Sequence, residues 1–250
     1  MKFFSLLLLL IPGFVHGQKA FTIVNIPDSL KENANVVYFI DEATFEIVDD
    51  SKAVYKSHTV AAILNSNGKK HATQYVGYDK LRKINSFTGM AYDENGNEIT
   101  KLKKSDIVDQ SNISGFSLYE DNRVQYADLK QNEYPYIVKF HYEVESKYTY
   151  SIPSWPVLSG ENASVVLSSY KIIFPKDLKP NTKLINTNEE LEITEVDGKI
   201  EILFEMKNVK AIEHESNSPP ANELYPILYA TSSKFNFEGY QGSFNSWEEM

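Results

Sequence analysis

Residues 136–144 read Tyr-Ile-Val-Lys-Phe-His-Tyr-Glu-Val, and this stretch sets the fold class. Every second residue is apolar or aromatic, while Lys139, His141 and Glu143 fall between them. Successive side chains of an extended strand point to opposite faces of a sheet, so strict alternation indicates a strand with one buried face. We therefore expect one face to carry the large side chains of Tyr136, Val138, Phe140, Tyr142 and Val144.

Outward from this strand, several pairs of similar segments are joined by turn signals. Residues 190–196 and 199–206 flank Asp197-Gly198, a dipeptide that tolerates the positive φ angles of a type I′ hairpin turn. Asn67-Gly68 gives the same signal between residues 55–64 and 73–78, and Asn95-Gly96 gives it between residues 84–92 and 98–102. A further β-branched and aromatic run covers residues 165–174 and ends at Pro175. We predict three hairpins and a long additional strand.

Helical signals are few, the clearest being a short lead-in helix within residues 27–34. Evenly spaced hairpins with little helix between them favour stacked antiparallel sheets over a parallel α/β sheet. The predicted fold class is mainly β, an antiparallel β-sandwich with short helical elements. Residues 216–220, Ser-Asn-Ser-Pro-Pro, are expected to form a linker or a break between two strands of this sandwich.

The first residues resemble an export signal. Lys2 is followed by an apolar run through Phe14, and Val15-His16-Gly17 supplies small or slim residues before a cleavage point. The run is about 13 residues long, which is too short to span a bilayer that needs about 20. We expect residues 1–17 to be a signal peptide, with Gln18 first in an exported, periplasmic or extracellular chain that has no transmembrane span after cleavage.

Composition excludes several classes of function. The chain contains no cysteine, which removes disulfides, thiolate-ligated metals and a thiol nucleophile. Its formal net charge is −9 with scattered charges, whereas binding to nucleic acid requires clustered lysine and arginine. The sequence therefore predicts no nucleic-acid partner.

No local motif for catalysis, a cofactor or a metal is present. The histidines after His16 are isolated from one another, and the sequence has no P-loop, no dinucleotide-binding glycine motif and no Gly-x-Ser-x-Gly elbow. Residues 93–98 resemble a calcium loop, but the glycine stands at the fourth place and Lys104 occupies the position of the bidentate glutamate. A hairpin turn explains these residues better. We predict no catalytic residue, no cofactor and no metal site in this chain.

Aromatic residues are the more promising class for binding, with 16 Tyr, 14 Phe and 2 Trp. Tyr148, Tyr150 and Trp155 lie close together in sequence, and Pro153 and Pro156 flank the tryptophan. Rings on the surface of a sandwich can stack on sugars or peptides. Tyr148, Tyr150 and Trp155 are therefore candidate binding residues, although the same rings could simply fill the core and its edges.

Several segments in fixed order resemble the domain of unknown function 3857 family. Residues 35–37 and 63–70 resemble its start, and residues 78–84, 91–99, 104–107, 119–124 and 169–175 follow in the family's order. The resemblance covers about residues 30–215. It implies an N-terminal β-sandwich that precedes a transglutaminase-like core in exported bacterial proteins, with the Cys-His-Asp triad of that core further downstream.

The end of the chain fits this context. Residues 243–249 are similar to the first helix of a transglutaminase-like core, and Ser246-Trp247-Glu248-Glu249 forms a capping box that announces a helix. We expect residues 18–233 to form the sandwich domain and residues 234–250 to begin a truncated downstream domain. The spacing of aromatic residues after Lys234 fits neither a strand nor a helix for long.

Two functions follow from these observations. The first is a non-catalytic accessory or binding domain, whose partner is a downstream transglutaminase-like domain or a surface protein or glycan. The alternative is a cell-surface hydrolase, or a glycan- or peptide-binding protein, with a cleft site that the sequence does not reveal.

Overall fold

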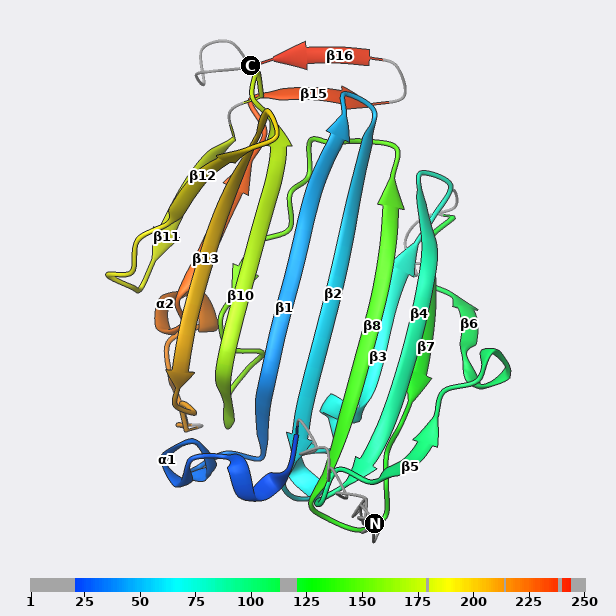
Figure 1. Cartoon of the computed structure of the whole chain (residues 1–250), viewed down its shortest axis with the longest axis vertical. Helices are drawn as coiled ribbons and strands as arrows, with labels where there is room; N and C mark the ends of the chain where they lie inside the picture. The colour runs from blue at the N-terminus through cyan, green and yellow to red at the C-terminus, as the bar shows by residue number, and fades with distance from the viewer. Residues whose placement is uncertain (1–20, 113–120, 179, 214, 238–239, 244–250) are drawn as a thin grey trace, which may run out of the picture.

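The computed structural model describes residues 21–112, 121–178, 180–213, 215–237 and 240–243. Its main feature is one long eight-stranded sheet, which forms the front layer in Figure 1. Neighbouring strands are antiparallel except for β1 and β10, which run parallel. In spatial order the strands are β12 (Glu192–Val196), β13 (Lys199–Val209), β10 (Ala163–Pro175), β1 (Val36–Asp49), β2 (Lys52–Ile63), β8 (Tyr136–Ser146), β4 (Arg82–Asp93) and β5 (Glu98–Lys101).

Two small sheets form the second layer and lie behind opposite halves of the large sheet (Figure 1). One contains β11 (Asn181–Ile185), β14 (Ile227–Thr231) and β9 (Trp155–Pro156). The other contains β3 (Thr73–Tyr78), β7 (Arg123–Asp128) and β6 (Val108–Ser111). The molecule is mainly β and resembles a sandwich, as the sequence predicts, but its second layer is divided in two.

The helices are short connections: η1 (Ile23–Asn25), α1 (Asp28–Lys31), η2 (Ser66–Ala72), η3 (Lys104–Asp106) and α2 (Ala221–Leu224). The lead-in helix is confirmed as α1, whose Leu30 is fully buried. No helix in the described part of the chain is long and apolar enough to cross a membrane.

Three apolar clusters hold the layers together. One joins the β11–β14–β9 sheet to the large sheet and includes Phe45, Trp155 and Tyr170. A second joins the β3–β7–β6 sheet to the large sheet and includes Phe140. The third packs the N-terminal segment, with Leu30, against the outer face of the large sheet, which is the face that points away from the second layer. Each half of the second layer therefore has its own core, and the large sheet supports both.

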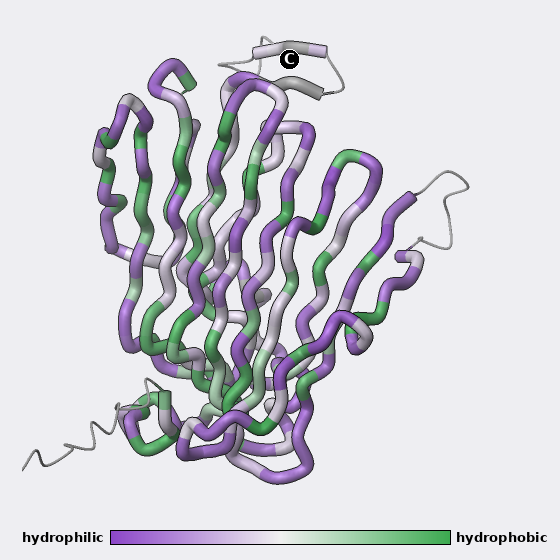
Figure 2. Tube along the Cα trace, turned by 45° about the vertical axis from the view of Figure 1, so that its right-hand side comes forward, coloured by the Kyte–Doolittle hydropathy of each residue, from purple (hydrophilic) through white to green (hydrophobic). Residues whose placement is uncertain are grey.

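The faces of β8 are as the sequence predicts. Phe140 is 2% exposed on the inner face, while His141 and Glu143 lie on the outer face. Figure 2 shows the corresponding alternation of hydrophilic and hydrophobic residues along the long strands. Much of the outer charge is paired across strands, as in Lys56–Glu143 and Lys171–Glu201.

Two of the three predicted hairpins are confirmed. Asp197 and Gly198 have φ angles of 52° and 77° and join β12 to β13. Gly96 has a φ of 74° in the turn between β4 and β5, and the Asp93 carboxylate accepts hydrogen bonds from the backbone N–H groups of Asn95 and Asn97. The resemblance of this segment to a calcium loop thus reflects a turn held by its own aspartate. The long strand that ends at Pro175 is β10.

The hairpin predicted at Asn67-Gly68 is wrong. These residues lie in η2, and β3 leaves the large sheet to pair with β7. A Cβ atom at position 68 would lie 2.2 Å from the carbonyl oxygen of Asn35. The glycine is therefore required by a close backbone approach, since any side chain there would collide with the start of β1.

The C-terminal part contains more strand than expected. Residues 216–220 form a break between β13 and β14, and β14 joins the second layer. β15 (Lys234–Phe237) and β16 (Tyr240–Ser243) then pair as a two-stranded antiparallel hairpin, which corrects the expectation of no regular strand there. Among the described residues this hairpin pairs only with itself. The predicted signal peptide at residues 1–17 and the predicted capping box at Ser246 lie outside the described residues.

Candidate functional site

A bulge in β1 places a carboxyl group on the inner face of the large sheet. Tyr38 of β1 pairs with Ala61 of β2, and Asp41 pairs with Thr59. Asp41 is thus three residues beyond Tyr38 on β1, while their partners are only two residues apart on β2. The extra residue restores the inward direction at Asp41, so that Tyr38 and Asp41 face the same side. Beyond Asp41 the regular alternation continues with buried Ala43 and Phe45.

Asp41 lies on the floor of a cleft of about 350 Å³. The floor consists of inner-face residues of β1, β2 and β8, and the walls come from the two halves of the second layer. One wall contains Trp155 and Pro156 of β9, and the other contains His71 of η2 and Thr73 of β3. The cleft thus opens where the second layer is divided. Its lining residues are Tyr38, Asp41, Tyr55, Ser57, Thr59, Ala61, Lys70, His71, Thr73, Gln74, Val138, Tyr142, Ser154, Trp155, Pro156 and Ser159.

The environment of Asp41 favours the neutral acid. Burial, with a smaller contribution from the negative charge of Glu42, raises the pKa of Asp41 to about 7. Among the described residues, no lysine or arginine forms an ion pair with this carboxyl group. By contrast, side-chain hydrogen bonds lower the pKa values of Asp28, Asp109 and Glu145. An acid with a strongly raised pKa that lies in a cleft without a cationic partner is a common mark of a functional site.

Three tyrosines surround Asp41. Its negative charge contributes to raised pKa values of Tyr38, Tyr55 and Tyr142, although burial is the largest cause at each. The Tyr38 hydroxyl lies 2.9 Å from His71 Nδ1. Burial, helped by the positive charge of Lys70, lowers the pKa of His71 to about 4, so its ring is neutral at pH 7 and one nitrogen can accept a hydrogen bond.

Trp155 forms the apolar wall. Its ring stacks on Tyr170 with centroids 5.1 Å apart and an interplanar angle of 17°. Its Nε1–H donates a 2.9 Å hydrogen bond to Ser168 Oγ. The tryptophan is 7% exposed and is fixed on two sides, so it is a rigid part of the cleft.

A second hollow of about 510 Å³ adjoins the Asp41 cleft and shares Lys70 and His71 with it. Its other lining residues are mostly polar: Asn35, Asn67, Gly160, Glu161, Asn162 and Tyr225. The two hollows together give a ligand room to extend beyond the aromatic cleft.

The predicted binding residues separate into two places. Tyr148 and Tyr150 pack on each other with ring centroids 4.8 Å apart, and Tyr150 is 44% exposed, but neither lines the Asp41 cleft. Trp155 does line it. His141 lies beside His58 on the outer face, with ring centroids 6.3 Å apart. No cluster of three potential metal-binding side chains occurs among the described residues.

Sequence reasoning missed Asp41 itself. A signal was available, because an acidic residue interrupts the apolar start of the strand in Val36-Val-Tyr-Phe-Ile-Asp41. Regular alternation would place Asp41 on the opposite face from Tyr38, and only the bulge brings the two together.

The fold and the cleft define the chain as a β-rich sandwich domain. The model of one family, described as "Domain of Unknown Function with solved-structure structure (DUF3857)", matches residues 49–213. The chain belongs to this family, as its sequence resemblance indicates. No curated protein matches the sequence.

One solved structure shares the fold at low sequence identity, and others superpose with lower scores. A protein of Parabacteroides distasonis, described as a "putative protease", superposes with a TM-score of 0.67 at 16% identity, covering 79% of this chain and 40% of that chain. An M1 zinc metallopeptidase of Deinococcus radiodurans gives a TM-score of 0.34 at 10% identity, covering 78% and 42%. Aminopeptidase A of Legionella pneumophila gives 0.35 at 12% identity, covering 79% and 21%. The chain thus spans less than half the length of each of these proteins.

Proposed function

We propose that this chain is a non-catalytic binding domain of an exported protein, and that the Asp41 cleft is its ligand site. The observation that carries the proposal is the division of the second layer, which leaves an aromatic cleft with a carboxyl group at its floor. Concave sites with apolar walls and a few convergent polar groups are where proteins bind small ligands or single side chains.

The chemistry of the cleft favours binding over catalysis. Glycoside hydrolysis commonly uses two carboxyl groups that face the same bond, and Asp41 is the one carboxyl group among the lining residues. His71 Nδ1 is paired with the Tyr38 hydroxyl instead of with a serine, which favours binding over nucleophilic catalysis through this nitrogen.

The domain's context is part of the proposal. The similar Parabacteroides structure contains this fold as 40% of a longer chain that is described as a "putative protease". We therefore propose that the domain positions a bound peptide or glycan for a transglutaminase-like or peptidase-like module, outside the cytoplasm.

The test is to block the cleft. Thr59 lines its floor, so Thr59→Phe places a ring there, while Thr44→Phe places the same ring on the outer face of β1. Short peptides and oligosaccharides are titrated by NMR against the chain and both variants. Chemical-shift changes at cleft residues that Thr59→Phe abolishes and Thr44→Phe retains would support the proposal.

Two results would contradict it. One is that no peptide or oligosaccharide perturbs the cleft residues at millimolar concentration. The other is the appearance of cleaved products by mass spectrometry, because a non-catalytic domain returns its ligand unchanged.

A further inference from the structure

We propose that the Asp41 cleft binds the side-chain ammonium group of a lysine residue in a peptide ligand. This inference rests on the proposed binding function and deepens it by naming the ligand's chemistry. Its basis is the position of one carboxyl group among three tyrosines and a tryptophan, next to a polar hollow that can hold a peptide backbone.

Charge favours a cationic ligand. Asp41 forms no ion pair with a described lysine or arginine, although Lys70 also lines the cleft, and the neighbouring charge that raises its pKa is the negative charge of Glu42. Above pH 7 Asp41 is mostly ionised, so a neutral ligand would leave its carboxylate unpaired and an anionic ligand would be repelled. An ammonium group would supply the missing cation and could donate three hydrogen bonds to the carboxylate and to neighbouring hydroxyl groups such as Ser57.

The aromatic lining of the cleft also suits an ammonium group. Tyr38, Tyr55, Tyr142 and Trp155 line the same cleft as Asp41. Aromatic faces attract cations, and aromatic-lined sites are a common means of recognising ammonium groups. The rings also suit the four-carbon stem of a lysine, which packs on apolar surfaces while its charged end reaches a polar group.

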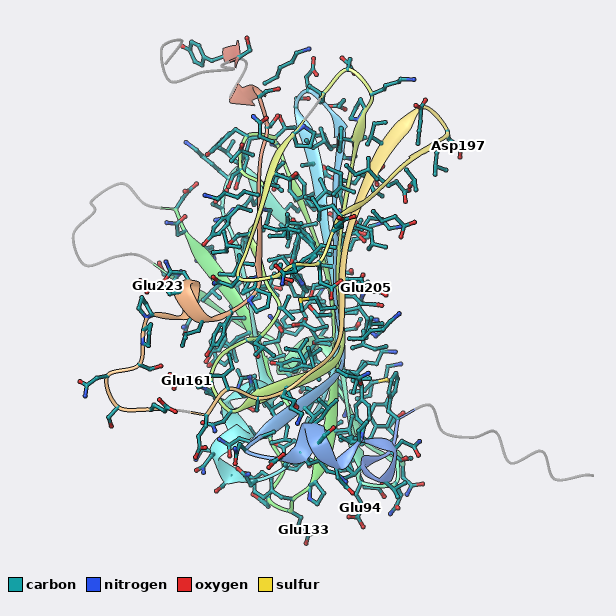
Figure 3. The ribbon with its side chains drawn as sticks, turned by 90° about the vertical axis from the view of Figure 1, so that its left-hand side faces the viewer. Glu94, Glu133, Glu161, Asp197, Glu205 and Glu223 are labelled. Atoms are coloured by element: carbon teal, nitrogen blue, oxygen red, sulfur yellow. The ribbon has the colours of Figure 1, made fainter. Side chains whose placement is uncertain are left out.

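The adjoining hollow suits a peptide backbone. Asn35, Asn67 and Asn162 line it, and each amide side chain offers both a donor and an acceptor, which match the N–H and C=O groups of a peptide. Glu161 also lines this hollow and lies on the side of the second layer in Figure 3. Its negative charge, with the formal net charge of −9, favours the approach of a cationic peptide.

A small metal cation fits the cleft less well. Hard cations in proteins take six or more oxygen ligands, commonly from several carboxylates. The cleft provides one carboxyl group with bulky tyrosines around it. An organic cation with an apolar stem matches both the single carboxyl group and the aromatic rings of the lining.

The experiment compares two peptides that differ in one charge. Acetyl-Gly-Lys-Gly-amide and the same peptide with an acetylated lysine side chain are titrated by calorimetry and NMR at pH 8. The free lysine peptide should bind at least about tenfold more tightly, with shift changes at Tyr55 and Trp155. Asp41→Asn should weaken its binding by about tenfold or more. Asp50→Asn, which removes an exposed carboxylate, should leave it unchanged.

The outcomes separate this inference from the proposed function. Equal affinities for the two peptides, or full binding by Asp41→Asn, would overturn the ammonium proposal. If an oligosaccharide occupies the cleft and the lysine peptide does not, the ammonium proposal fails while the binding function stands. If neither kind of ligand perturbs the cleft, both fail.

Discussion

Replacing Asp41 with Asn should stabilise the protein at alkaline pH. The two side chains have nearly the same shape, so the substitution mainly removes a carboxyl group that can ionise. The pKa of Asp41 is about 7 in the folded chain and 3.8 without the protein environment. Folding thus favours the protonated acid, and the wild-type chain loses stability as the pH rises from about 4 through 7.

The magnitude follows from the difference in pKa. Each unit corresponds to about 1.4 kcal/mol, so the full difference corresponds to about 4 kcal/mol. Asp41 is partly exposed at the floor of the cleft, and solvent screening reduces this figure. We expect Asp41→Asn to be more stable than wild type by about 2–4 kcal/mol at pH 8 and by nearly zero at pH 4.

Urea denaturation at several values between pH 4 and pH 8 measures this difference. Asp50→Asn serves as the control, because Asp50 is an exposed carboxylate in the turn after β1. Its difference from wild type should stay within about 0.5 kcal/mol at every pH. Parallel curves for Asp41→Asn and wild type would refute the reasoning, since they would mean that folding does not change the protonation of Asp41.

Four further predictions concern the fold and the ends of the chain. Phe140→Ala should lower the free energy of unfolding by about 3–5 kcal/mol and His141→Ala by under about 0.5 kcal/mol, because the two residues lie on opposite faces of β8. Chemical denaturation measures both values, and comparable losses of stability would contradict the assignment of the faces. Gly68→Ala should lower the melting temperature far more than Gly77→Ala. A Cβ atom at position 68 would lie 2.2 Å from the Asn35 oxygen, whereas a Cβ atom at position 77 would lie 4.0 Å from its nearest neighbour, the Arg123 oxygen. Amide exchange across β15 and β16 should be fast in the isolated chain, and strong protection there would show that the hairpin has a stable packing partner. N-terminal sequencing of the exported protein should begin at Gln18, and an intact Met1 on a membrane-bound product would contradict the signal peptide.

Local sequence signals predicted the strands and their faces well. The alternation in residues 136–144 requires only that one face is buried, and the large sheet satisfies this. Asp197-Gly198 and Asn95-Gly96 both adopt the turns that their residue types favour, because these turns depend on neighbouring residues alone.

Features that depend on distant contacts were not predictable in this way. Gly68 looks like a turn residue, but its role is to admit the backbone of Asn35. The division of the second layer arises because β3 pairs with β7 and β14 pairs with β11, and no short motif encodes these pairings. The cleft depends on both this division and the bulge in β1. Of the three candidate aromatic residues, only Trp155 lines the cleft, since Tyr148 and Tyr150 lie elsewhere.

The most direct test of the account is the pKa of the Asp41 carboxyl group, measured by NMR of its side-chain carbon. We expect about 7 in the free chain, and a clear decrease when the lysine peptide is bound, because a nearby positive charge favours the ionised form. The described titratable groups around Asp41 should affect its pKa equally in the free and the bound chain. They are Tyr38, Tyr55, Tyr142, His71, Lys70 and Glu42. A value near 4 in the free chain, unchanged by the peptide, would contradict the claim that the cleft holds an unpaired acid awaiting a cation.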